Sequence, residues 1–161
     1  MQSPSRRAGI FYLCIGLLLV AFGTLSHAWV SSLGSSAVDV RVGLVSYLRA
    51  DGAERSLGEV RFLYLALVAY WTAMATLLVG AITVIASIGN ALEGRMRPEG
   101  APLPWMSWAR VCGWLALMYA VAVAGVVAAL ISYPIMPGAS AAIAFAGGAL
   151  TMVGARKLDR G

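Results

Sequence analysis

The sequence predicts an all-α membrane protein, a four-transmembrane-helix bundle with a small extracytoplasmic β-hairpin between helices 1 and 2. The 161 residues are 60% hydrophobic and 12% charged, and the mean hydropathy is +0.82. A chain this apolar belongs to the integral membrane class. The apolar residues also form four separate runs, and one polar stretch between the first two runs alternates as a β-strand does.

The four apolar runs define the expected helices of a single domain, 1–161. They cover about 9–30, 61–88, 108–132 and 138–155. A helix needs about 20 residues to cross the bilayer core, so each run suits one span. Between them lie an external loop at 31–60, a cytoplasmic loop at 89–107 and a tight reversal that contains Pro134 and Pro137.

A cleavable signal peptide is the alternative for the first run. Ser26-His27-Ala28 resembles a cleavage site with small residues at both ends. The apolar region of a signal peptide usually has about 7–15 residues, and this run is longer. We therefore expect a retained first helix.

Basic residues predict the orientation. The side of the two termini carries Arg6, Arg7, Arg95, Arg97, Arg110, Arg156, Lys157 and Arg160. On the opposite side, four arginines are offset by Asp39, Asp51, Glu54 and Glu59. Because cytoplasmic loops are enriched in Lys and Arg, we expect both termini in the cytoplasm. The Ala-, Gly-, Val- and Arg-rich composition is typical of a GC-rich bacterial genome, which indicates a bacterial inner (cytoplasmic) membrane.

The external loop has the alternation of a half-buried strand over 38–48. Asp51-Gly52 suits a type I′ turn, and 54–57 would form the return strand. Arg49 would then lie opposite Glu54 as an ion pair. The alternative is an irregular loop in which the alternation arises by chance.

An isolated hairpin is marginal in water, so the apolar face of this one requires cover by its own chain or by another protein. We expect an external contact surface at this hairpin. Its residues are Val40, Val42, Leu44, Tyr47 and Leu48.

Small residues at four-residue spacing predict close helix packing. The packing residues are Ala120, Ala124 and Ala128 in the third span, and Ser140, Ala144 and Gly148 in the fourth. We expect these two spans to pack tightly against each other. A face for self-association is the alternative for the same stripes. The first span has a further series, Gly9, Gly16 and Gly23, at heptad spacing.

The sequence offers no catalytic, cofactor-binding or metal-binding constellation. We place no charged residue inside a span, whereas buried ionisable residues mark proton relays and ion sites. The chain has one histidine and two cysteines, and the cysteines form no CxxC motif. The net charge of +5 is explained by orientation, so we expect no nucleic-acid partner. These observations predict a protein that is not an enzyme.

The layout resembles the claudin and peripheral-myelin-protein family of four-span proteins. Trp29 is similar to the Trp after the first span of that family, and Gly43-Leu44-Val45 to its Gly-Leu-Trp triplet. Arg61 corresponds to a basic residue at the start of the second span. The disulfide-bonded cysteine pair of the family loop has no counterpart here. The resemblance implies a bundle with an external sheet that makes lateral or cell–cell contacts.

We therefore expect a non-enzymatic membrane protein that contacts a protein partner, or a copy of itself, through the external hairpin. The alternative is an accessory subunit of a larger membrane complex, such as a transporter or a respiratory enzyme, that binds through its helix faces. A small transporter or channel is a third hypothesis, weakened by the absence of charges expected within the spans.

Overall fold

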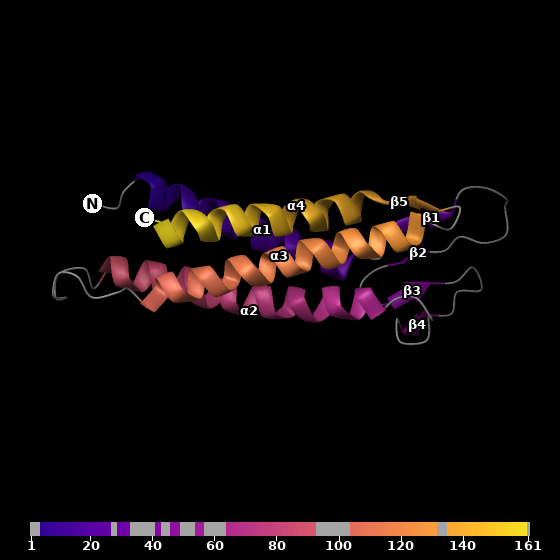
Figure 1. The fold of residues 1–161 in the computed structure, drawn as a ribbon, viewed down its shortest axis with the longest axis horizontal. Coiled ribbons are helices and arrows are strands. Elements are labelled where there is room, and N and C mark those ends of the chain that lie inside the picture. The colour runs from indigo at the N-terminus through magenta and orange to yellow at the C-terminus, as the bar shows by residue number, and fades with distance from the viewer. Residues whose placement is uncertain are drawn as a thin grey trace.

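The computed structural model describes residues 4–26, 29–32, 41–42, 46–48, 54–56, 64–92, 104–131 and 135–160. Its four long helices lie side by side, with both chain termini at one end and the strands at the other (Figure 1). They are α1 (Pro4–Leu25), α2 (Tyr64–Leu92), α3 (Pro104–Ile131) and α4 (Ala139–Arg160). Each is long and apolar enough to cross a membrane, which confirms the predicted four-helix membrane bundle.

The helices are shifted along the chain from the predicted spans. The first helix begins at Pro4 and ends at Leu25, where the prediction placed it at 9–30. Proline suits a first helical turn because its missing N–H needs no partner there. At the terminus-side end, α2 continues to Leu92 and α4 to Arg160, since their polar final turns can extend beyond the lipid core.

The closest helix contact joins α1 to α4, and α3 packs against both α2 and α4. The heptad glycines of α1 explain the close approach of the first pair. A Cβ at Gly16 would lie 2.5 Å from the backbone nitrogen of Thr151, and a Cβ at Gly23 would lie 2.6 Å from the Cβ of Ala144. We expected α3 and α4 to form the tight pair; they are in contact, but the glycine seam is between α1 and α4.

The side chains inside the bundle form two apolar clusters. The cluster near the strands includes Trp29, Tyr119 and Val123. The cluster near the termini includes Leu13 and Cys112. Large apolar side chains also cover the outside of the helices, among them Phe22, Leu78, Trp71 and Val121. An apolar exterior is what a bundle surrounded by lipid requires.

Two short strands join the ends of the helices. After α1, β1 (Val30–Ser32) pairs antiparallel with β5 (Ile135–Pro137), which immediately precedes α4. The Gly138 amide donates to the Trp29 carbonyl at 2.6 Å, so the next pair, Val30 with Pro137, is of the non-hydrogen-bonded kind. Pro137 therefore occupies a ladder position at which no N–H is needed. The sequence analysis assigned this segment only a tight reversal.

Three further strands form a second small sheet. The strands β2 (Arg41–Val42), β3 (Ser46–Leu48) and β4 (Glu54–Ser56) are adjacent in that order and antiparallel. The predicted continuous strand over 38–48 is wrong, because the chain reverses between β2 and β3. Gly43, a residue suited to turns, lies in the sequence that joins them.

The predicted pairing of the return strand is also wrong. The observed register places Leu48, and not Arg49, opposite Glu54. This register is centred on position 51 rather than between Asp51 and Gly52, so it does not match the two-residue turn that we inferred from Asp51-Gly52. Both of these residues and Arg49 lie outside the described part of the chain.

Candidate functional sites at the two ends of the bundle

Trp29 anchors the strand-bearing end of the bundle. Its side chain is 1% exposed, and its indole N–H donates to the Gly23 carbonyl at 2.6 Å. The Gly23 carbonyl belongs to the last turn of α1, where the helix leaves carbonyls without partners. Because the Trp29 backbone also accepts the Gly138 amide, this residue connects α1, β1 and the beginning of α4.

A few buried polar contacts hold the same region. Thr24 donates to the Val20 carbonyl at 2.7 Å, and its oxygen lies 3.4 Å from the Tyr119 hydroxyl. The Ser26 and Ser140 hydroxyls are 2.8 Å apart. Polar contacts between helices are one of the few associating forces in lipid, so these pairs help to fix α1 against α3 and α4 just below β1.

Only part of the predicted external contact surface lies in the described residues. Val42 and Tyr47 occupy opposite positions in the β2–β3 ladder, and Leu48 is opposite Arg41. Val40, Gly43, Leu44 and Arg61 lie outside the described part of the chain, so their positions are not compared with the prediction. Trp29, which the family resemblance singled out, is buried in the interior of the bundle.

The predicted packing residues fall into two groups. Ala120, Ser140 and Ala144 are buried, and Gly148 is close enough to Ala120 that an added Cβ would lie 3.1 Å from the alanine Cβ. Ala124 and Ala128 are instead exposed. Together with Ala142 and Phe145 they line an apolar groove of about 520 Å³ between the strand-side halves of α3 and α4.

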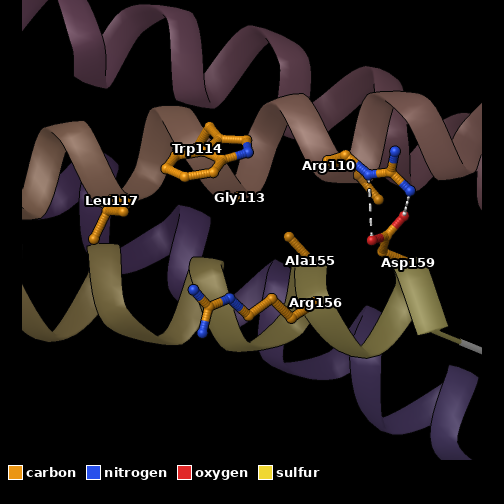
Figure 2. Close-up of a pocket in the computed structure, with 8 residues that line it drawn as sticks. Arg110, Gly113, Trp114, Leu117, Ala155, Arg156 and Asp159 are labelled. Atoms are coloured by element: carbon orange, nitrogen blue, oxygen red, sulfur yellow. Dashed lines mark hydrogen bonds and ion pairs between the residues drawn. The ribbon is translucent and has the colours of Figure 1, made fainter.

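A second hollow lies between the terminus-side ends of the same helices (Figure 2). Its volume is about 380 Å³. The lining residues are Ala109, Arg110, Gly113, Trp114, Leu117, Ala155, Arg156 and Asp159. We refer to it as the Arg110–Arg156 cavity. It combines charged groups with an aromatic and an aliphatic side chain, a composition suited to amphipathic ligands.

An ion pair bridges the mouth of this cavity. The Arg110 Nη2 atom lies 3.1 Å from Oδ1 of Asp159, and its Nε donates to Oδ2 at 3.4 Å. Both residues fall within helix segments apolar enough to span the membrane. Our expectation that no span contains a charged residue is therefore wrong. Arg110 already lay inside the predicted third span, 108–132, whereas Asp159 enters a span because α4 continues past the predicted end at 155. The two charges offset each other there.

Other basic residues at this end also have defined partners. Arg6 donates from Nη2 to the Ser87 carbonyl in α2 at 2.7 Å, and the Lys157 ammonium lies 4.9 Å from the centre of the Tyr12 ring. A cation near a helix C-terminus interacts favourably with the helix dipole. No local sequence pattern could predict such partners, because Arg6 and Ser87 are 81 positions apart and Arg110 and Asp159 are 49 positions apart.

The described residues contain no cluster of three or more His, Cys, Asp and Glu side chains that would hold a metal ion. The fold thus defines an integral membrane protein with four spanning helices, a strand-bearing end and an amphipathic cavity at the opposite end. In comparisons with known proteins, no family model and no curated sequence matched the chain.

Proposed function

We propose that this chain is a non-enzymatic membrane protein that uses its strand-bearing end to contact another membrane protein or a second copy of itself. The distribution of basic residues supports a location in the bacterial inner membrane, with both termini in the cytoplasm and the strands outside. The single observation that carries the proposal is the anchoring of that end on the bundle by Trp29 and the β1–β5 pair.

Anchoring matters because a contact surface on a fixed base binds at a lower entropic cost than a surface on a free loop. Two of the strands are tied directly to helices. The residue before β1 is buried against α1, and β5 leads without a break into α4. The chain that leaves β1 toward β2 therefore starts from a defined position at the membrane surface.

The second small sheet supplies the reason for a partner. Strands of two or three residues form a sheet that is marginal by itself. The outer strands, β2 and β4, each have one edge that pairs with no other described strand, and exposed strand edges favour pairing with another chain. A partner strand that pairs with one of these edges would extend this sheet, stabilise it and be bound by it.

The resemblance to the claudin and peripheral-myelin-protein family supports the same use of this end. The resemblance rests on the four predicted spans, the long first external segment and the Trp after the first span. Here the two external segments are joined through β1 and β5. We propose a claudin-like arrangement in which lateral contacts are made without the family's loop disulfide.

An accessory subunit of a larger membrane complex, such as a transporter or respiratory enzyme, is the second candidate. The apolar groove along Ala124, Ala128 and Phe145 favours it. Small residues on an open helix face let a neighbouring helix approach closely. In this case the contact surface lies within the membrane rather than outside it.

Co-purification from native membranes in mild detergent distinguishes the two candidates. One variant lacks residues 49–53, and the other is Ala124→Leu, which fills the exposed groove. Contact through the strands predicts that the deletion releases the partner while Ala124→Leu retains it. The reverse pattern supports the accessory subunit. Gly148→Leu is unsuitable as a groove variant, because an added side chain would meet Ala120 and the Ala116 carbonyl inside the bundle.

A further inference from the structure

We propose that the Arg110–Arg156 cavity binds one anionic glycerophospholipid from the leaflet on the side of the chain termini. Arg156 and Arg110 hold the lipid phosphate. One acyl chain lies along Trp114 and Leu117. This site is independent of the contact surface proposed above, since it lies at the opposite end of the bundle (Figure 1).

Arg156 provides the first argument, because its guanidinium needs an anion. It makes no ion pair or hydrogen bond with any residue that the structure describes. Its side chain runs along α4 away from Asp159 and toward the Leu117 end of the cavity (Figure 2), as helical side chains lean toward the N-terminus of their helix. This direction takes the charge toward the bilayer interior, where an unpaired cation is costly.

Arg110 provides the second argument. Asp159 engages Nε and Nη2 of its guanidinium, which leaves Nη1 without a partner among the described residues. Two arginines and one aspartate give the cavity a net charge of +1. Basic pockets between helices at this depth favour anionic headgroups, and a guanidinium matches the geometry of a phosphate.

The rest of the lining suits an acyl chain. Gly113 and Ala155 face each other across the two helices and leave room for a ligand because they are small. An added Cβ on Gly113 would lie 3.5 Å from the Cβ of Ala155. Trp114 is 65% exposed and stands beside the cavity (Figure 2). Adjacent residues of the cavity can therefore bind both the charged headgroup and the apolar chain of a phospholipid. A soluble phosphate would contact only the charged residues.

A separate apolar groove lies farther along the same two helices, in the direction that an acyl chain would take. Arg110, Leu117 and Ala124 are spaced by seven residues and so share one face of α3. Arg110 and Leu117 line the cavity, and Ala124 lines the apolar groove farther along the same two helices. A chain that starts at the arginines can follow this face into the bilayer.

The test compares lipids on the full-length protein in an uncharged detergent. The probes are phosphatidylglycerol and phosphatidylcholine with identical acyl chains, and inorganic phosphate in a third arm. Native mass spectrometry counts bound lipid, and thermal unfolding reports stabilisation. We expect one retained phosphatidylglycerol and a raised Tm, weaker retention of phosphatidylcholine, and no comparable effect of phosphate.

Three variants locate the site. Arg156→Gln should weaken phosphatidylglycerol binding about tenfold, the loss expected for one charge-assisted contact. Arg7→Gln is the matched control, since it removes the same charge from an exposed position outside the cavity. Asp159→Asn should have the opposite effect and strengthen binding, because it removes the negative charge at the cavity mouth.

Equal retention of the two lipids would overturn the proposal, as would equal losses in Arg156→Gln and Arg7→Gln. Stabilisation by inorganic phosphate as strong as that by phosphatidylglycerol would assign the cavity to a soluble anion instead. The lipid comparison uses the unaltered chain, so it decides the matter even if a variant folds poorly.

Discussion

A single buried indole connects three elements at the strand-bearing end. Trp29 lies beyond the end of α1, yet its N–H returns to the Gly23 carbonyl and its backbone accepts the Gly138 amide. Sequence alone predicted that a Trp follows the first span and that it belongs to a recognisable loop pattern. It did not predict burial, because Trp29 belongs to an apolar cluster with members from all four helices, most of them far along the chain.

Replacing Trp29 by phenylalanine removes the donor and keeps most of the apolar volume. A buried carbonyl left without its partner costs about 1–3 kcal/mol, so we expect the free energy of unfolding in detergent micelles to fall by about that amount. Trp71→Phe is the control, because Trp71 is 66% exposed on the outside of α2. Equal stability losses in the two variants would contradict an anchoring role for Trp29.

At the scale of the elements, the helices pack most closely where glycines of α1 face α4. The heptad series in the first span was visible in the sequence, and it predicted that this helix approaches another one closely. The partner could not be predicted, because every span carries small residues at helical spacing. The structure shows that α4 is the partner, with Gly16 against the Thr151 backbone.

Gly16→Ala should separate α1 from α4, because the new methyl group would meet backbone atoms of Thr151 that cannot move aside. Overpacking of this kind costs about 1–3 kcal/mol. Gly89→Ala is a matched control in α2, where nothing lies within 4 Å of the added Cβ, and it should leave the protein unchanged or slightly more stable. Unfolding in detergent measures the stability of both variants. Destabilisation by Gly89→Ala alone would contradict the close packing of α1 against α4 at Gly16.

The β1–β5 pair had no signal in the sequence, since strands of three residues are too short for an alternation to be recognised. Their register makes the pairing testable. Ser32 and Ile135 are Cα partners at a non-hydrogen-bonded position, where the Cα atoms approach to about 4.5 Å.

Cysteines at Ser32 and Ile135, with Cys14 and Cys112 replaced by alanine, should therefore form an intramolecular disulfide under mild oxidation. Non-reducing electrophoresis after cleavage between the two positions detects the bond. A pair at Ser32 and Ala86 is the control, since these residues lie at opposite ends of the bundle (Figure 1). Failure of the first pair to crosslink would show that the segments after α1 and before α4 are not joined as described.

For the whole molecule, hydropathy was sufficient to predict four spans, because apolar length is a property of each segment separately. Contacts between segments could not be predicted in the same way. The Arg110–Asp159 pair joins two helices, whereas the sequence indicated only that Arg110 is one of the basic residues on the terminus side. Likewise, the strand over 38–48 was predicted from alternation alone, which carries no information about where the chain reverses.

The proposal as a whole depends on whether the strand-bearing end contacts a protein in the native membrane. A photoreactive residue at Tyr47, in β3, tests this most directly, with the same residue at Ile85 on the exposed face of α2 for comparison. After illumination of intact cells, the account predicts a discrete crosslinked protein, or a dimer of this chain, from position 47 and a much lower yield from position 85. Monomer alone at position 47, with a discrete adduct at position 85, would contradict it.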